Sequence, residues 1–312
     1  MTALSLFELK VSIVGSGRVG SSIAINVCLR ELGDVMLLDI VKGLPQGEAM
    51  DINHLLSEQG NDCRVEGSNE YEEMQNSDFV VIVAGIGRKP GMTRMDLLKT
   101  NSGIVKDVCN SVSRYCPKSF VVVVTNPLDP LTYLTLKMMT SDRRKIMGMG
   151  GMLDLSRFIE HISKCTDTSR GSIQAMVISE HGENMLPLIR FSSIAGIPLT
   201  SFITDSQAEE LVVKTRQIAA EVISLKGATV YAPGNAVSAM IESIAKNRRA
   251  VMPVSTLLNG EFGHEDVCIG VPCVLGSYGV EKIIELNLNK LEKEIFSEGV
   301  RSIKTAIKQL PL

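Results

Sequence analysis

The chain is predicted to be an α/β protein built on a doubly wound parallel sheet. Its first half alternates short, nearly continuous apolar runs with helical patterns, and such runs are typical of strands covered by helices on both faces. A glycine-rich turn follows the first run, so we expect ligands at the carboxyl ends of the strands. The expected strands are 10–14, 35–40, 79–85 and 120–126, with helices over 19–32, 47–56 and 95–115.

A second domain is predicted from the length and from a change of pattern. The 312 residues exceed one typical domain, and the alternation of strands and helices gives way to longer helices after the cluster MGMGG at 147–151. We therefore expect a first domain at 1–150 and a second, α+β domain that binds the substrate at 151–312. Its expected elements are helices over 153–165, 205–226, 235–247 and 290–310, and strands at 175–180, 250–258 and 267–276.

Composition excludes several classes of partner and site. The net charge is −3, from 32 basic and 35 acidic side chains without long runs of one sign, which argues against a nucleic acid or a membrane surface as partner. The seven cysteines are scattered, without a C-x-x-C pair, so neither a disulfide framework nor a metal site is expected. The N-terminal sequence MTALSLFELK resembles no targeting signal, and no apolar run is long enough to span a bilayer. A cytoplasmic location is expected.

The residues Gly15-Ser16-Gly17-Arg18-Val19-Gly20 match the pattern G-x-G-x-x-G. Alone the pattern is weak, but here it follows an expected strand and opens an expected helix, as a Rossmann-type dinucleotide site requires. The first glycine permits the tight turn, the second lets the backbone approach a pyrophosphate, and the third lets the helix pack on the strand. A glycine-rich turn without a ligand is the alternative.

Asp39 closes the second expected strand, nineteen residues after Gly20. A carboxylate there can accept hydrogen bonds from the adenosine ribose hydroxyls and repels a 2′-phosphate, so NAD is favoured over NADP. Lys42 lies close in sequence and weakens that rejection. The alternative is an acidic side chain that only caps the next helix.

Five charged residues form the candidate catalytic site: Arg88, Arg94, Asp154, Arg157 and His181. Fixed cations beside one imidazole suit a small anionic substrate that gains or loses a proton. Asp154 and Arg157 are three residues apart on an expected helix and so share one face. Taken alone, they could form an ordinary surface ion pair, and an isolated histidine is more often structural than catalytic.

The chain resembles the lactate/malate dehydrogenase family over nearly its whole length, most closely the malate dehydrogenases of lactate-dehydrogenase-like type. The resemblance implies an NAD-dependent oxidoreductase that interconverts (S)-malate and oxaloacetate, with lactate or another 2-hydroxy acid as the alternative substrate. The motifs that carry it are GSGRVG, LLDIVKGLPQGEAMDI, VAGIGRKPGMTRMDLL, VTNPLDPLTY, MLDLSRF, EHGENMLPL and IGVPCVLGSYGVEKIIEL.

The resemblance implies a role for each candidate residue. His181 is the general acid and base, and Asp154 orients it and raises its proton affinity. Arg157 binds the carboxylate beside the reacting carbon as a bidentate fork. Arg94, on a loop that closes over the substrate, polarises the reacting carbonyl.

Arg88 is the expected specificity residue. An arginine enclosed in a dry site requires a second carboxylate, so it selects a dicarboxylate and penalises monocarboxylates. A solvated Arg-Lys pair at a loop tip is the alternative. Asn126 is expected near the nicotinamide and the substrate oxygen, unless it only forms an Asn-Pro turn, and Thr229 is expected to line the pocket.

The resemblance also implies contacts with NAD and a setting for the enzyme. We expect a homo-oligomer, a tetramer rather than a dimer, acting in the tricarboxylic acid cycle; apolar faces at 43–56 and 153–165 serve either as interfaces or as core. A non-catalytic NAD-binding protein is the rival from another class. The expected cofactor-binding residues are Gly15, Gly17, Arg18, Val19, Gly20, Asp39, Ala84, Gly85, Asn101, Val124 and Asn126.

Overall fold

The structure is a computed structural model, which describes residues 9–87, 91–139 and 142–311. Within them, a six-stranded parallel sheet forms the first half, in the order β3-β2-β1-β4-β5-β6. This is the strand order of a Rossmann-type dinucleotide-binding domain, and it confirms the predicted fold class. The strands are β1 (Lys10–Val14), β2 (Asp34–Leu38), β3 (Val65–Ser68), β4 (Phe79–Ile82), β5 (Phe120–Val123) and β6 (Ile146–Gly148).

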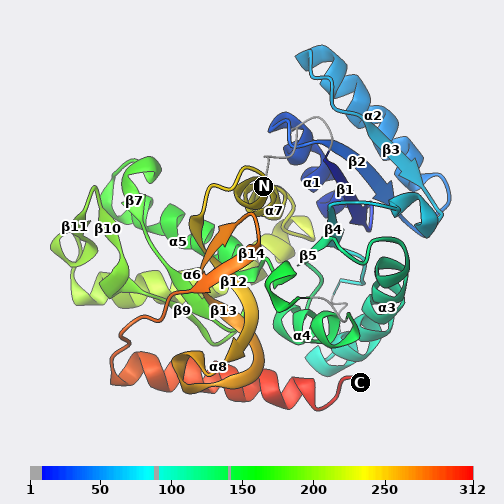
Figure 1. Ribbon diagram of the computed structural model, residues 1–312. Helices are drawn as coiled ribbons and strands as arrows, with labels where there is room; N and C mark the ends of the chain where they lie inside the picture. The colour runs from blue at the N-terminus through cyan, green and yellow to red at the C-terminus, as the bar shows by residue number, and fades with distance from the viewer. Residues whose placement is uncertain (1–8, 88–90, 140–141, 312) are drawn as a thin grey trace.

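Helices connect these strands on both faces of the sheet (Figure 1). The helix α3 begins with a capping box, in which Thr93 accepts from the Asp96 N–H and the Asp96 carboxylate accepts from the Thr93 N–H. The helices and short 3₁₀ turns of this half are α1 (Arg18–Leu29), α2 (Leu44–Gln59), η2 (Tyr71–Met74), α3 (Arg94–Tyr115), α4 (Leu128–Met138) and η3 (Arg143–Lys145).

The second half continues the same sheet with antiparallel strands. β12 (Ala250–Asn259) pairs with β6 through Ser255 and Gly148, and the order then runs β12-β13-β8-β9, with β14 on β13. A small three-stranded sheet lies apart in the order β11-β10-β7. The remaining strands are β7 (Ile173–Gln174), β8 (Val177–Ser179), β9 (Met185–Pro187), β10 (Ser193–Ile194), β11 (Ile197–Pro198), β13 (Glu265–Gly276) and β14 (Gly279–Ile283).

Four long helices cover this half. α8, drawn red in Figure 1, runs beneath both halves of the molecule, and Lys106 of α3 donates to the Pro311 carbonyl oxygen near its end. The helices and 3₁₀ turns are α5 (Gly150–Thr166), η4 (Arg170–Ser172), η5 (Ile189–Phe191), η6 (Leu199–Ser201), α6 (Asp205–Lys226), α7 (Tyr231–Ala245), η7 (Glu261–Gly263) and α8 (Lys290–Ile307).

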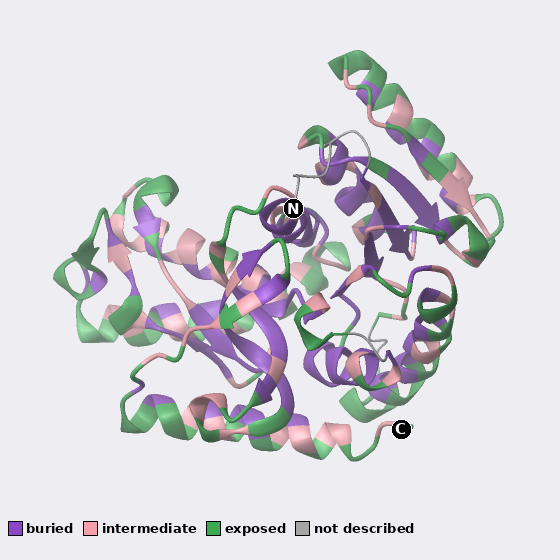
Figure 2. Ribbon diagram, in the orientation of Figure 1, coloured by how far each residue is buried: buried purple, intermediate pink, exposed green. Residues whose placement is uncertain are grey.

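Most strands of the large sheet are buried in both halves of the molecule (Figure 2). The inward runs of β1, β4 and β5 are almost entirely buried, as expected for parallel strands between two helical layers. All seven cysteines are free, and five of them are buried, where thiols pack as small apolar groups. No helix of the described residues is long and apolar enough to cross a membrane.

Some predicted boundaries differ from the structure. β4 and β5 end at Ile82 and Val123, three residues earlier than predicted, because the residues that follow leave the ladder to form loops. The helix α4 and several short strands were not predicted, namely β3, β6, β7, β9, β10, β11 and β14. α4 carries Pro130 in its first turn and follows Pro127, so its sequence looked like a turn although proline is tolerated at that end of a helix.

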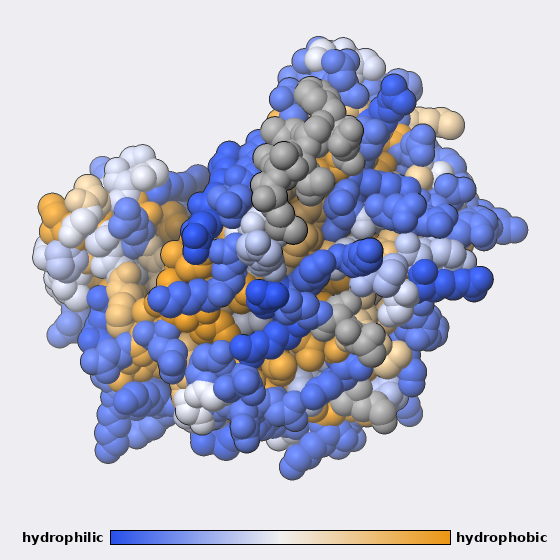
Figure 3. Space-filling model, viewed as in Figure 1, coloured by the Kyte–Doolittle hydropathy of each residue, from blue (hydrophilic) through white to orange (hydrophobic). Residues whose placement is uncertain are grey.

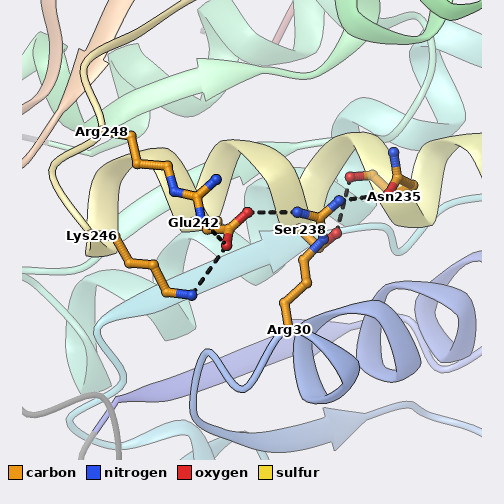
Figure 4. Close-up of polar contacts among 6 residues, drawn as sticks. All are labelled: Arg30, Asn235, Ser238, Glu242, Lys246 and Arg248. Atoms are coloured by element: carbon orange, nitrogen blue, oxygen red, sulfur yellow. Dashed lines mark hydrogen bonds and ion pairs between the residues drawn. The ribbon is translucent and has the colours of Figure 1, made fainter. Parts of the chain in front are cut away.

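An ion-pair cluster on α7 joins the two halves (Figure 4). Glu242, whose side chain is 8% exposed, accepts from Arg30 of α1 at 2.5 Å, from Lys246 at 3.1 Å and from Arg248 at 2.7 Å. Arg30 also donates to Asn235 at 2.7 Å. Burial alone would raise the pKa of Glu242, but the three cations outweigh burial and hold that pKa below its ordinary value.

Replacing Glu242 by glutamine is expected to lower the free energy of unfolding by about 2 kcal/mol, because charge-assisted hydrogen bonds between α1 and α7 are lost. Since the pKa of Glu242 is lowered on folding, its stabilisation is present above its ordinary pKa and is lost as the pH falls through the folded value. Denaturant unfolding at neutral and acidic pH measures both effects. Glu210→Gln, at an exposed pair with Lys214, is the control and should change nothing measurable; an equal loss in both variants would contradict the assignment.

Candidate active site

The glycine-rich loop between β1 and α1 forms an open cradle. Gly15 has φ +107°, and a Cβ there would lie 2.7 Å from the Ala84 N atom, so glycine is required at this turn. A Cβ on Gly17 would meet nothing within 4 Å, which leaves space for a ligand. No described side chain caps α1, so its first N–H groups remain available to phosphate oxygens. The loop therefore fits the pyrophosphate of a dinucleotide.

Other predicted cofactor residues surround this loop. Arg18 is exposed and donates to the Lys226 carbonyl oxygen at 3.3 Å, while Val19 packs on the core. Asp39 follows β2, and its carboxylate accepts from the N–H groups of Ser16 at 2.8 Å and Val41 at 3.0 Å. Asp39 thus fixes the loop and the local turn, and its half-buried carboxylate still lies beside the cradle where a ribose would bind.

The ends of β4 and β5 carry the next group of predicted residues. Ala84 and Gly85 follow β4, and a Cβ on Gly85 would lie 2.5 Å from the Thr125 methyl group. Val124 is buried after β5. These positions lie at the carboxyl ends of adjacent strands, where ligands bind in such sheets.

Asn101 of α3 stabilises the loops at this edge of the sheet. It is fully buried; its side chain donates to the Asn126 carbonyl oxygen at 2.7 Å and exchanges hydrogen bonds with both backbone groups of Ile86. Asn126 is exposed and precedes a cis bond to Pro127. Asn101 therefore holds the backbone of Asn126, and a direct contact of Asn101 with the cofactor stays a prediction.

His181, Asp154 and Arg157 meet in the second half. The His181 Nδ1 atom lies 2.6 Å from Asp154 Oδ2, and Arg157 Nη1 donates to Asp154 Oδ1 at 3.0 Å. Thr229 accepts from Arg157 Nη2 at 3.4 Å. α5 presents Asp154 and Arg157 on one face, as their spacing predicted, and the loop after β8 brings His181 to them.

The carboxylate of Asp154 controls the imidazole. The Asp154 side chain is only 1% exposed, so its charge acts in a poorly screened environment. Burial by itself would lower the pKa of His181, but the Asp154 charge and hydrogen bond, together with the charge of Asp129, outweigh burial and raise it. The imidazole can therefore hold a proton near neutral pH and release it during a reaction.

Arg94 lies next to this group at the first position of α3. Its Nη2 atom forms an ion pair with Glu180 Oε1 at 2.9 Å, and Glu180 is the residue before His181. A Cβ on Gly182 would collide with the Arg94 guanidinium, so the glycine leaves room for it. Arg88, the expected specificity residue, lies outside the described residues, together with Lys89 and Pro90 of the same loop.

Two buried carboxylates near His181 were not singled out by the sequence patterns. Asp129 Oδ2 accepts from the His181 N–H at 2.8 Å, and Glu180 accepts from Asn184 at 2.6 Å and Ser302 at 3.1 Å. Their sequence signal was their place in the segments TNPLD and SEHG. Among the described residues, no group of three histidine, cysteine, aspartate or glutamate side chains is arranged to hold a metal ion.

Comparisons with known proteins agree with this geometry. Residues 9–148 match the model for the lactate/malate dehydrogenase NAD-binding domain, and residues 151–311 match that for the family's α/β C-terminal domain. Malate dehydrogenase of Desulforudis audaxviator is 39% identical over 97% of this chain and 99% of its own length, and that of Caldivirga maquilingensis is 41% identical over 96% and 98%.

Solved structures include both branches of the family. Malate dehydrogenase of Cryptosporidium parvum superposes with a TM-score of 0.94 and is 39% identical, covering 97% of this chain and 98% of its own. Lactate dehydrogenase of the same organism, solved with lactic acid and nicotinamide adenine dinucleotide, superposes with a TM-score of 0.93 at 37% identity, covering 97% and 98%.

A dinucleotide cradle joined to a histidine–carboxylate–arginine group defines an oxidoreductase that depends on a nicotinamide cofactor, NAD. The matched models and relatives place it more narrowly. The chain belongs to the lactate/malate dehydrogenase family.

Proposed function

We propose that this chain is an NAD-dependent malate dehydrogenase, which transfers hydride reversibly between (S)-malate and oxaloacetate. The observation that carries the proposal is the group formed by His181, Asp154 and Arg157, with the 2.6 Å contact between the first two. NAD supplies the hydride chemistry when it is bound. The relatives named malate dehydrogenase support the choice of substrate.

Each residue has a defined task in this proposal. His181 accepts the hydroxyl proton of malate and returns it to the carbonyl oxygen in the reverse direction. Arg157 binds the carboxylate beside the reacting carbon, with its orientation fixed by Asp154 and Thr229. Arg94 stabilises the developing oxyanion. Asn126 follows β5 at the carboxyl edge of the sheet, where it would lie near the nicotinamide and the substrate oxygen.

Lactate dehydrogenase activity is the second candidate, because structures of both branches superpose almost equally well. The sequence feature that favours malate is Arg88, which would pair with the second carboxylate of a dicarboxylate. The fold therefore does not choose between the two substrates, and the choice depends on chemistry at the loop.

An assay of NADH oxidation with oxaloacetate and with pyruvate tests the substrate. We expect kcat/KM for oxaloacetate to exceed that for pyruvate by at least about a hundredfold, the cost of an unpaired buried charge. Arg88→Gln should reduce the oxaloacetate value heavily and narrow that gap. A wild-type preference for pyruvate would refute the proposal, and an equal loss of both activities in the variant would mean that Arg88 is structural. Repeating the assay with NADPH tests the role of Asp39.

The remaining proposals concern setting and assembly. We propose a division between domains near residue 150, which the two matched models support by meeting between 148 and 151. The free cysteines support a cytoplasmic location. The proposed substrate supports a role in the tricarboxylic acid cycle. A nucleic acid is not expected as a partner because the net charge is −3. A membrane is not expected either, and the face in Figure 3 is mostly hydrophilic, with apolar side chains gathered near its middle.

We further propose a homo-oligomer, a tetramer rather than a dimer. Exposed apolar side chains on two helices support an interface between copies. They are Met50, 64% exposed, and Leu55 on α2, together with Val213, Ile223 and Leu225 on α6. By contrast, the apolar side chains Leu153, Phe158 and Ile162 of α5 are buried and belong to the core.

A further inference from the structure

Asp129 is a buried carboxylate directly behind His181. It lies in the first turn of α4 and is 1% exposed. Its Oδ2 atom accepts from the main-chain N–H of His181 at 2.8 Å. α4 belongs to the half that carries the glycine-rich loop, whereas His181 belongs to the other half. This hydrogen bond therefore connects the two halves at the candidate active site.

The other oxygen of Asp129 is left without a hydrogen-bond partner among the described residues. The Ser255 hydroxyl of β12, also unpartnered there, lies close enough to lower the pKa of Asp129, as does the His181 N–H. Burial raises the pKa of Asp129 more strongly than these two groups lower it, and the charge of Glu180 raises it further. The resulting pKa of Asp129 is about 6. Cys268 of β13 also faces Asp129, but its thiol stays neutral because burial raises its pKa well above the ordinary value.

Charged groups from two helices, α4 and α5, act on the His181 imidazole. Asp154 of α5 raises the pKa of His181 most, and Asp129 of α4 raises it further. Arg157 of α5 lowers that pKa. The neighbouring Glu180 forms an ion pair with Arg94. Because the pKa of Asp129 is about 6 and that of His181 is raised above 6.5, Asp129 is mostly ionised in the range in which His181 titrates.

We propose that Asp129 is a positioning residue for the reaction: its carboxylate holds the main chain of His181 and its charge stabilises the protonated imidazole. The proposal rests on the proposed function, in which His181 exchanges a proton with the substrate. Asp154 contacts the ring, whereas Asp129 reaches the same residue from the opposite domain. Proton affinity at the site thus depends on both halves of the chain.

The test is the pH profile of Asp129→Asn. The asparagine oxygen can still accept from the His181 N–H, and its NH₂ group can donate to the unpartnered Ser255 hydroxyl, so the anchor remains while the charge is removed. We expect the alkaline limb of kcat/KM for oxaloacetate reduction to move to lower pH by at least about 0.5 unit, a roughly threefold loss above the limb. A profile that stays in place would overturn the proposal, even if the overall rate falls.

Ser255→Ala is the matched control, because it removes the neighbouring hydroxyl and keeps the charge. Its alkaline limb should move much less than that of Asp129→Asn, because the carboxylate is retained. A shift equal to that of Asp129→Asn would mean that packing, not charge, sets the limb, which would also overturn the proposal.

An NMR titration of the histidine rings gives a readout that does not depend on activity. The His181 signal, assigned by its loss in His181→Gln, should titrate at lower pH in Asp129→Asn than in the wild type. If Asp129→Asn does not fold, the same titration of Ser255→Ala decides. Without the Ser255 hydroxyl, the pKa of Asp129 should rise. The small change that the ionisation of Asp129 causes in the His181 signal at acid pH should then move to higher pH. No such movement would refute the proposal. A wild-type chain inactive on oxaloacetate would refute the proposed function, while this titration would still decide the role of Asp129.

Discussion

His181→Gln is expected to lower kcat for oxaloacetate reduction by about three to four orders of magnitude, because it removes the group that supplies the proton. Glutamine keeps a similar size and can still donate to Asp154, so the buried carboxylate is not left alone. Binding of NADH, followed by quenching or calorimetry, should be unchanged, since the glycine-rich loop lies in the other half.

The pH dependence gives this prediction a second readout. Because the folded pKa of His181 is raised above its ordinary 6.5, the wild-type rate of oxaloacetate reduction should stay high to a pH above 6.5. It should fall as the pH rises through the folded value and the proton is lost. In His181→Gln that limb should disappear. The control is His54→Gln, at an exposed position on α2, which should keep both the rate and the limb; a retained limb in His181→Gln would refute the assignment.

Arg157→Lys is expected to lower kcat/KM for oxaloacetate by about two orders of magnitude, mainly through a higher KM. Lysine keeps the charge but cannot form the parallel pair of hydrogen bonds that a carboxylate accepts from a guanidinium. Arg157→Gln, which also removes the charge, should cost about tenfold more.

The structure supplies the control for this prediction. Arg157 is 11% exposed and donates to Asp154, whereas Arg170 is 66% exposed beside Glu160, so Arg170→Lys should leave the kinetics unchanged. A loss confined to kcat, with KM unchanged, would show that Arg157 acts through Asp154 and His181 and does not bind the substrate.

Much of the fold could be predicted because the local sequence determines where its main strands and helices form. The runs of β4 and β5 are wholly apolar, and that of β1 is mostly apolar. The glycine-rich turn fixes where the first helix begins. β3 was missed because its sequence VEGS contains one apolar residue and becomes a strand only by pairing with β2. Its structure is therefore a consequence of tertiary contacts.

Only part of the candidate site could be predicted from the local sequence. The spacing of Asp154 and Arg157 is enough to predict that both lie on one helical face. The contact of Asp154 with His181 spans 27 residues, and that of Asp129 with His181 spans 52, so neither could be derived from local pattern. Glu180 lies within the motif SEHG, but its partner Arg94 is far away in the chain, and only folding brings the two together.

The pairing of β12 with β6 through Ser255 and Gly148 has a mechanical consequence. The proposed boundary near residue 150 divides the sequence, but one sheet extends across it through this pair of residues. The two halves share one sheet, and a wide hinge rotation between them would break the pairing of β12 with β6. We therefore expect the adjustments during turnover to involve mainly side chains and local segments at the edge of the sheet, with little change in the distance between the cradle and the imidazole.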